Sequence, residues 1–584
     1  MSEALRVANC SGFYGDRLSA AREMVEGGPI DVLTGDYLAE LTMLILLKDK
    51  TRDPKRGYAR TFLRQLQDVA VSCREQDIKI VVNAGGMNPA GLADASQRVF
   101  DAAGRGGKVA YIDGDDLLGR LDELQAQGET LAHLDKGTPL SELDYEVLSA
   151  NAYLGGFGIV EALNRGADLV ICPRVTDAAV VVGPAAWKFG WARNDWDQLA
   201  GAVVAGHIIE CGAQCTGGNY SYFDEIDSLA RPGFPIAEMY PDGSFVITKH
   251  EGTDGEVSVG TITAQLLYEI QSERYANPDV VARFDTIRLD QEGPDRVRVS
   301  GIRGEPAPSS IKVCMNYLGG YKNATTFLIP GRGSEAKARV IEEGFRNHVG
   351  GLEQFQESRI TMRHGGKGDD EAFALMTIAA RDPDERKVGR AFWNAGIEMA
   401  LGNYPGFQTA GSSRAALAVT VYWPTLVSSD KIDERVFVDG EQIPIAQATP
   451  TDSFEPIEAP DPPDGELPGG PTREAPLGLV VGARSGDKGG NANVGFWTRT
   501  PEAYLWMAAF LTEDRIRELY PESRELEISR YELPNMLSIN FVIHGLLGDG
   551  VSASLRPDPQ AKMLGEEIRA KKAEIPKSLL EPSG

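Results

Sequence analysis

Short apolar runs alternate with longer helix-like stretches along roughly the first 240 residues of the chain. Five runs have the length and composition of buried strands, and they are Leu5–Ala8, Ile30–Asp36, Ile78–Asn83, Val109–Asp113 and Leu169–Pro173. Such runs, separated by helical segments, are typical of a mostly parallel sheet covered by helices on both faces. We therefore predict an α/β domain with a mostly parallel sheet over residues 1–243.

The pattern changes over residues 244–445, where strands with polar alternation lie between long helical stretches. Strands are expected at residues 245–248, 286–289, 297–300, 311–316 and 416–422, and helices at residues 334–348 and 385–400. This order predicts an α+β middle domain that packs on the first.

Residues 446–476 are proline-rich and acidic, and they contain too little apolar surface to fold alone, so we expect an extended linker. Residues 477–584 then show strands and helices in the order ββαββα, which is typical of a small ferredoxin-like α+β module.

Each predicted strand of the first domain runs directly into a glycine-rich or polar loop. In open parallel sheets, ligands bind outside the carboxyl ends of the strands. The alternative is that glycine and aspartate simply make tight strand-to-helix turns. We expect a substrate site whose candidate residues are Ser11, Asp36, Glu40, Asn83, Gly85, Gly86, Asn88, Arg174 and Asp177.

Asp36 and Glu40 are four residues apart, so both carboxylates lie on one helix face if a helix begins near Asp36. Asp36 is then either an N-cap or a ligand-facing carboxylate. Glu40 is a candidate general base if it is partly desolvated.

The segment from Asn83 to Asn88 offers amide groups and two glycines, which suit the binding of a carbonyl or carboxylate oxygen. A tight turn closed by Pro89 explains the same residues equally well. Arg174 either binds a substrate anion through its fork of donors or pairs with Asp177. Asn88 and Asp177 complete the candidate catalytic set.

His207, Glu210, Cys211 and Cys215 form the most reactive-looking cluster of the chain. His207 is a candidate acid–base residue, and a nucleophilic Cys215 or a zinc site is the alternative to inert buried thiols. The apolar pair Ile208-Ile209 favours a short strand here, which would scatter the cluster. His364 is a further loop histidine, either a base or a solvated side chain.

The glycine-rich segment from Arg484 to Asn493 combines two cations with a hydroxyl group and exposed backbone N–H groups. Such a loop suits an anion, for example a phosphate of CoA or a substrate carboxylate. The candidate binding residues are Arg484, Ser485, Lys488 and Asn491. The alternative is a solvated hairpin.

The chain has 584 residues, with 59 basic and 85 acidic side chains and a net charge of −26. This charge disfavours nucleic acids and anionic membranes as partners. The longest apolar run, Met43–Leu47, is too short to span a membrane, and the N-terminus lacks the build of a signal peptide. The six sparse cysteines favour a cytoplasmic protein without disulfides and without structural zinc.

Several segments together resemble the AtuA family of acyclic terpene utilisation proteins, and the resemblance spans nearly the whole chain. The segments are residues 8–16 (ANCSGFYGD), 33–40 (LTGDYLAE), 83–89 (NAGGMNP), 171–177 (ICPRVTD) and 206–218 (GHIIECGAQCTGG), and residues 483–489 (ARSGDKG) resemble the family's ferredoxin-like module. The resemblance implies bacterial breakdown of citronellol- and geraniol-type compounds as acyl-CoA esters, beside a biotin-dependent acyl-CoA carboxylase.

These observations predict a catabolic enzyme of terpenoid or branched acyl-CoA breakdown with hydratase or lyase chemistry. Carboxylate and amide groups can perform such acid–base chemistry without a cofactor or a metal. A non-catalytic accessory protein of the carboxylase and a metal-dependent hydrolase remain alternatives. We expect a small-molecule substrate, such as an acyl-CoA, and a homo-oligomer.

Overall fold

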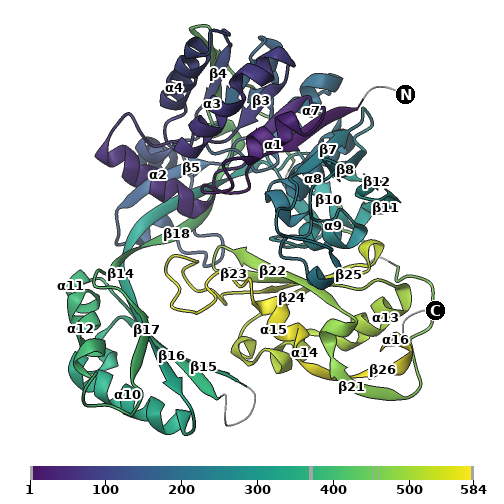
Figure 1. Ribbon diagram of the computed structural model, residues 1–584. Coiled ribbons are helices and arrows are strands. Elements are labelled where there is room, and N and C mark those ends of the chain that lie inside the picture. Colours follow the sequence, from purple (N-terminus) through teal and green to yellow (C-terminus); the bar gives the residue numbers. More distant parts are fainter. Residues whose placement is uncertain (1–3, 367–371, 452, 459–460, 581–584) are drawn as a thin grey trace.

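The structure is a computed structural model that describes residues 4–366, 372–451, 453–458 and 461–580. Figure 1 shows an N-terminal part at the top, a middle lobe at the lower left and the C-terminal module at the lower right. Helices and strands are mixed throughout, which confirms the α/β class.

An eleven-stranded sheet forms the centre of the N-terminal part. Its spatial order is β11 (Arg288–Gly293), β12 (Arg296–Ser300), β8 (Phe245–Lys249), β7 (Pro235–Met239), β1 (Leu5–Asn9), β2 (Val32–Gly35), β3 (Lys79–Val82), β6 (Leu169–Ile171), β4 (Val109–Asp113), β19 (Arg435–Val438) and β20 (Glu441–Pro444). The five central strands, β1, β2, β3, β6 and β4, are parallel, and each contains residues of one of the five predicted runs.

Helices cover both faces of this sheet, because alternate residues of each central strand enter different cores. Ile80 and Val82 face one core and Val81 faces the other. The first core includes α1 (Ala20–Glu26), α3 (Arg60–Glu75) and α4 (Pro89–Ala102), and the second includes α6 (Phe157–Asn164), α7 (Ala179–Phe189) and α8 (Trp196–Ile209). The remaining helices of this part are α2 (Glu40–Arg52), α5 (Leu121–Ala126) and α9 (Val259–Leu266).

The sheet continues across residue 243, where the sequence suggested that the first domain ends. Strands β7 and β8 form an antiparallel hairpin around that position, and β12 pairs with β8. Strands β19 and β20 add the opposite edge through β4. A small antiparallel sheet of β13 (Arg303–Glu305), β10 (Val281–Arg283) and β9 (Arg274–Ala276) packs against α8.

The middle lobe is built on β14 (Ser310–Pro330), the long strand that leaves the N-terminal part together with β18 (Leu417–Ser428) (Figure 1). Its other strands are β15 (Glu357–Gly365), β16 (Phe373–Asp382) and β17 (Gln408–Ser412), and β5 (Val147–Ala152) also pairs with β14. Helices α10 (Ser334–Val349), α11 (Glu385–Val388) and α12 (Arg390–Glu398) supply buried residues to one core with β14 and β16.

The C-terminal module has a four-stranded antiparallel sheet in the order β22 (Gly482–Lys488), β23 (Asn491–Trp497), β25 (Ser538–Ile543) and β24 (Ile528–Leu533). Helices α13 (Pro501–Phe510), α14 (Glu513–Leu519) and α15 (Leu564–Arg569) share a core with this sheet. The described order from β22 to α15 contains the predicted ββαββα pattern. Strand β21 (Thr472–Pro476) pairs with β26 (Lys572–Pro576), and α16 (Lys577–Leu580) follows.

The predicted linker is residues 446–476. Its described residues up to 471, which exclude 452, 459 and 460, form no helix and no strand, whereas Thr472–Pro476 form β21. None of the helices within the described residues combines the length and apolar character that crossing a membrane takes.

Candidate functional site

The loops after β1, β2 and β3 meet through direct hydrogen bonds. The side-chain amide of Asn83 donates to Asp36 Oδ1 at 2.5 Å, and its oxygen accepts the N–H of Tyr37 at 2.7 Å. The carbonyl of Ser11 accepts the N–H of Asp36 at 2.8 Å. Because the carboxyl ends of parallel strands lie at one sheet edge, three sequence-predicted residues, Ser11, Asp36 and Asn83, come together here.

Asp36 is not the N-cap of α2, since that helix begins at Glu40 with Ala39 at the cap position. The Asp36 carboxylate instead accepts the N–H of Leu38 at 3.0 Å, so it closes a local turn before the helix. The side chain is 6% exposed. Asp36 is therefore a buried carboxyl at the strand ends rather than a helix cap.

Arg174 connects the strand-end loops. Its guanidinium group donates to the carbonyl of Leu38 at 2.9 Å and lies 3.1 Å from the carboxylate of Asp177. It also stacks on the ring of Tyr153, 4.0 Å from the ring centre. The predicted alternative of an Arg174–Asp177 pair is thus present, and it is part of a larger buried cluster.

Glu40 lies beside this cluster at the first residue of α2. Its carboxylate accepts a hydrogen bond from the hydroxyl of Tyr153 at 2.7 Å and lies 3.7 Å from the ammonium of Lys312. Burial raises the pKa of Glu40, but Lys312, Arg174 and the Tyr153 hydroxyl outweigh it and lower the pKa to about 2. An acid this strong is a weak general base, so the geometry favours an electrostatic role.

His207 and Glu210 lie at the C-terminal end of α8, which is buried almost all round. The short strand expected at Ile208-Ile209 is therefore wrong, because apolar residues on every face are also typical of a buried helix. Three residues apart on the helix, His207 Nδ1 and Glu210 Oε1 lie 3.3 Å apart. Burial lowers the pKa of His207 to about 4, with Lys488 adding to the effect.

Two carboxyl groups of the cluster are held towards their protonated form. Burial raises the pKa of Asp36, and the nearby Asp177 raises it further, while Arg174 opposes the shift. Burial likewise raises the pKa of Glu210, followed by Asp177 and Glu269. The cluster thus contains two carboxyl groups with raised pKa values, Asp36 and Glu210, and one with a lowered pKa, Glu40. Pairs of carboxyl groups whose pKa values are shifted apart are used for acid–base catalysis.

Several buried polar atoms of the cluster make no hydrogen bond with the described residues. They include Arg174 Nε, His207 Nε2 and Glu210 Oε2. Buried polar atoms without partners are rare in native proteins, and a catalytic role or a bound water or ion is among their explanations. Among the described residues, no group of three or more His, Cys, Asp or Glu side chains is arranged to hold a metal ion.

The loop between β22 and β23 brings the C-terminal module to the same site. The ammonium of Lys488 lies 5.8 Å from the ring centre of Tyr275, a neighbour of His207. Among the described residues, this ammonium has no ion-pair partner within 4 Å. A partly buried cation without a direct partner, placed beside acidic side chains, suits the binding of an anion.

The other candidates of this loop have structural contacts. The guanidinium group of Arg484 donates to the side chain of Gln214 and stacks on Tyr268 at 4.2 Å. The hydroxyl of Ser485 accepts the N–H of Gly565 at 3.0 Å. Asn491 donates to Asp135 at 2.8 Å and accepts the N–H of Gly545, also at 2.8 Å. These contacts fix the loop and dock it on the rest of the chain.

Three candidates at the end of β3 lie in the turn that starts α4. Asn88 caps this helix, because its side chain accepts the N–H of Gly91 at 3.0 Å. Gly85 approaches the carbonyl of Cys172 so closely that a Cβ atom would lie 2.6 Å from it, and Gly86 has a φ of +49°. The turn alternative therefore explains Asn88, Gly85 and Gly86 better than substrate contact does.

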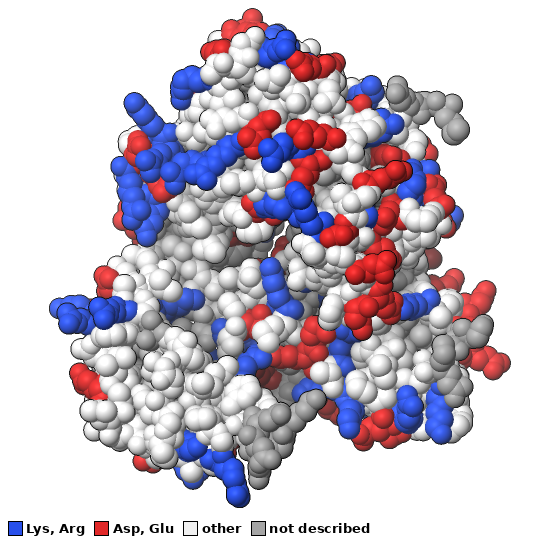
Figure 2. Space-filling view, in the orientation of Figure 1, with Lys and Arg blue, Asp and Glu red and all other residues white. Residues whose placement is uncertain are grey.

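A cleft of about 80 Å³ opens beside the cluster. Its polar lining includes Glu40, Tyr422 and Asp487, and its apolar lining includes Leu41 and Leu44 of α2. The lining comes from the N-terminal part, the middle lobe and the C-terminal module. On the face in Figure 2, the surface is hollowed near the centre, where the upper part meets the two lower lobes.

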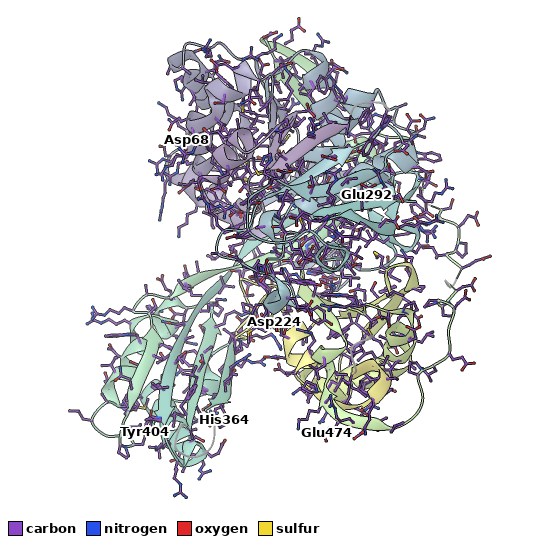
Figure 3. All side chains as sticks on the ribbon, turned by 45° about the vertical axis from the view of Figure 1, so that its right-hand side comes forward. Asp68, Asp224, Glu292, His364, Tyr404 and Glu474 are labelled. Carbon is purple, nitrogen blue, oxygen red and sulfur yellow. The ribbon has the colours of Figure 1, made fainter. Side chains whose placement is uncertain are left out.

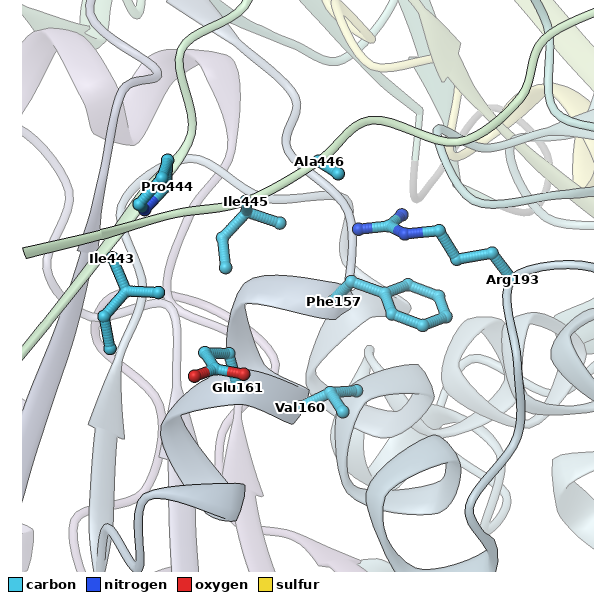
Figure 4. Close-up of a pocket in the computed structure, with 8 residues that line it drawn as sticks. All are labelled: Phe157, Val160, Glu161, Arg193, Ile443, Pro444, Ile445 and Ala446. Atoms are coloured by element: carbon cyan, nitrogen blue, oxygen red, sulfur yellow. The ribbon is translucent and has the colours of Figure 1, made fainter.

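A second pocket, of about 250 Å³, lies elsewhere, between α6 and the segment after β19 (Figure 4). The guanidinium group of Arg193, which lines this pocket, stacks on the ring of Phe157, 3.9 Å from the ring centre. The remaining lining is mostly apolar, and it contains none of the predicted site residues. His364 lies far from the cluster at the outer end of the middle lobe (Figure 3), on strand β15, with its side chain 54% exposed.

Sequence reasoning missed the residues that come from distant segments. Tyr153 and Lys312 surround Glu40, Tyr275 and Glu269 surround His207, and Asp487 faces the cleft. Asp487 stands next to Lys488 in a segment that was recognised, so its motif could have revealed it. The other four carry no local signal, because only the fold brings them to the site.

Asp115 is a buried carboxyl that contacts the backbone of Arg174, and it provides a test of how burial changes pKa values near the site. Its carboxylate accepts hydrogen bonds from the side chain of Asn151 at 2.8 Å and from the N–H of Arg174 at 3.2 Å. Burial raises the pKa of Asp115 to about 7, although the hydrogen bond from Asn151 opposes the shift.

A carboxyl whose pKa is raised in the folded state lowers the stability of the folded protein as the pH rises from the ordinary pKa of the carboxyl towards the raised one. From about pH 5 to about pH 8, Asp115 should therefore cost the folded protein about 2–3 kcal/mol. We expect Asp115→Asn to remove this loss, as measured by urea unfolding at both pH values. The same pH dependence in the variant and the parent would contradict the assignment.

With this geometry established, the comparisons place the chain among known proteins. The model of the acyclic terpene utilisation family protein AtuA matches residues 5–438, and that of the AtuA ferredoxin-like domain matches residues 475–574. The chain therefore belongs to the AtuA family, and its C-terminal module is the ferredoxin-like domain of that family. Searches of curated proteins and of solved structures found no match.

Proposed function

We propose that this protein is a cytoplasmic catabolic enzyme that acts on a terpenoid or branched acyl-CoA, or on the corresponding acid, by hydratase or lyase chemistry. The observation that carries the proposal is the buried cluster in which Asp36 and Glu210 have raised pKa values beside the ionised Glu40. Membership of the acyclic terpene utilisation family supports the choice of substrate class.

The cluster suits proton transfer next to a carbonyl group. A carboxyl whose pKa is raised can donate a proton, and after donation it can accept one. The cations of Arg174, Lys312 and Lys488 would stabilise negative charge on a thioester or carboxylate oxygen. The apolar side chains of Leu41 and Leu44 would contact the hydrocarbon chain.

The proposal is tested by incubating the protein with isoprenoid acyl-CoA esters and with the free acids. Hydration would add the mass of water to the substrate, and reversible proton abstraction in D₂O would introduce deuterium. Mass spectrometry detects both products, and a thermal-shift measurement detects binding. Binding without any conversion would favour the accessory-protein alternative, and the absence of both would contradict the proposal.

Lys488 provides a prediction about substrate binding. We expect Lys488→Ala to weaken binding of an acyl-CoA or acid by about 1–3 kcal/mol, because a charge-assisted contact is lost. Lys572→Ala is the matched control, since Lys572 pairs with Glu474 on the surface of the same module. Isothermal titration calorimetry measures both affinities. Equal affinity in the Lys488 variant and the parent would show that the loop cation faces no ligand.

A further inference from the structure

The turn that follows α9 has a strained backbone at one residue. Glu269 has a φ of 58°, in the left-handed region that residues with a side chain seldom adopt. Such a conformation persists only where the surrounding structure enforces it, and it is found preferentially at functional sites. The contacts around the turn, residues 267–271, therefore indicate what enforces the strain.

Asn493 of β23 bonds to both ends of the strained part. Its side-chain amide donates to the carbonyl of Leu267 at 2.7 Å, and its oxygen accepts the N–H of Glu269 at 2.9 Å. Asn493 is fully buried. One side chain of the C-terminal module thus satisfies two backbone groups of the N-terminal part.

Asn540 of β25 extends the same arrangement. Its amide donates to the carbonyls of Ile270 at 3.2 Å and Gln271 at 3.0 Å, and its oxygen accepts a hydrogen bond from Asn493 at 2.9 Å. Asn540 is also fully buried. Buried side-chain amides have few alternative partners, so these bonds are costly to break.

Two glycines of the module allow the turn to approach. A Cβ atom at Gly486 would lie 2.4 Å from the ring of Tyr268, and a Cβ atom at Gly495 would lie 2.5 Å from Leu267. Larger residues at these positions would push the turn away. The fit between module and turn is therefore specific on both sides.

The turn carries a carboxyl into the candidate site. Burial raises the pKa of Glu269, while Lys488 and Tyr268 oppose the shift. The charge of Glu269 in turn influences the pKa values of His207, Glu210 and Asp487. Glu269 is therefore within electrostatic reach of His207 and Glu210 in the cluster and of Asp487, which lines the cleft.

We propose that Asn493 and Asn540 are positioning residues through which the C-terminal module holds the strained turn and keeps the Glu269 carboxyl in the site. The inference rests on the proposed function for the role of the site. The contacts between the module and the turn do not depend on it. The C-terminal module is then a part of the site and not only a domain attached to it.

Hydrogen–deuterium exchange of peptides covering residues 266–272 tests the positioning without any ligand. We expect faster exchange in Asn493→Ala than in the parent protein. Asn535→Ala is the matched control, because Asn535 also donates two bonds across the same interface, to the carbonyls of Phe284 and Ile287, both at 2.9 Å. Equal exchange of the turn in the two variants would overturn the proposal.

Glu269→Gly provides a second test that does not depend on the folding of the Asn493 variant. Glycine adopts positive φ without strain, so this variant should unfold at a higher temperature than the parent. A lower unfolding temperature in Glu269→Gly would show that the turn is not strained, and would contradict the proposal.

The functional part is tested with one probe, the CoA ester of the acid derived from geraniol. Relative to the parent, Asn493→Ala and Glu269→Gly should each weaken its binding about tenfold or more, which corresponds to about 1.4 kcal/mol, and Asn535→Ala should not. If the parent does not bind the probe, the proposed function fails for this substrate while the exchange data still decide the positioning. Unchanged binding in both variants would overturn the role of Glu269.

Discussion

Replacement of Arg174 by alanine is expected to destabilise the protein by about 3–5 kcal/mol near neutral pH, because it leaves buried carboxylates without their cation. Arg174 is 3% exposed. It lowers the pKa values of Asp36 and Glu40, and it contacts Asp177 at 3.1 Å. The loss also includes its stacking on Tyr153.

The loss should depend on pH in a direction that identifies its cause. Without Arg174, the folded-state pKa values of Asp36 and Glu40 rise, and Asp36 carries the pH dependence because its pKa is already above its ordinary value. A carboxyl with a raised folded-state pKa lowers the stability of the fold as the pH rises from the ordinary pKa towards the raised one. At a pH below both values it has no effect, because the carboxyl is protonated in the folded and in the unfolded protein. We therefore expect a larger deficit at about pH 8 than at about pH 5. Urea unfolding at both pH values measures the difference.

Arg296→Ala is the control for this experiment. Arg296 pairs with Glu238 at 2.7 Å, but its side chain is 39% exposed. Exposed pairs contribute only about 0–1 kcal/mol, so this variant should stay close to the parent at both pH values. A deficit in Arg174→Ala that is equally small, or that does not change with pH, would contradict the electrostatic account of the cluster.

The strands of the first sheet could be predicted because each is a short, buried, β-branched run. The run at Ile80, Val81 and Val82 is apolar throughout, since its alternate residues enter two different cores. The same property misled the prediction at Ile208-Ile209. Helix α8 is buried on all sides from Leu199 to Ile209, so this part of its sequence lacks the polar face by which a surface helix is recognised.

The candidate site could be predicted only where it follows a strand end. Asp36, Asn83 and Arg174 have this local signal, and the structure brings them together. The same signal also selected Asn88, which caps a helix. Lys312 and Glu269 lie in segments that carry no sequence motif by which a site could be recognised. Long β14 brings Lys312 to Glu40, and a turn held by the C-terminal module brings Glu269 to Lys488.

Glu210 is the acid whose loss should have the largest effect on the proposed chemistry. Removing a general acid or base typically lowers the rate about 10²–10⁴-fold, and we expect this loss of conversion in Glu210→Gln. The Glu210 side chain is 7% exposed, and its Oε2 atom has no hydrogen-bond partner among the described residues. No hydrogen bond to a described residue therefore competes with a ligand for this atom.

The same substitution should stabilise the fold, which separates a catalytic role from a structural one. Burial raises the pKa of Glu210, so its carboxyl costs more stability as the pH rises from its ordinary value towards the raised one. Glutamine has the same shape and does not ionise. The Glu210→Gln variant should therefore unfold at a higher urea concentration than the parent, with a larger gain at about pH 8 than at about pH 5.

Glu238→Gln is the matched control, because Glu238 pairs with Arg296 outside the cluster. It should retain conversion and change stability by no more than about 1 kcal/mol. Conversion is measured by mass spectrometry with the acyl-CoA ester that the parent turns over. A variant of Glu210 that is less stable at every pH would assign the carboxyl a structural role. If the variant is more stable and retains full conversion, another group must transfer the proton. Asp36 is then the next candidate, because its pKa is raised in the same way.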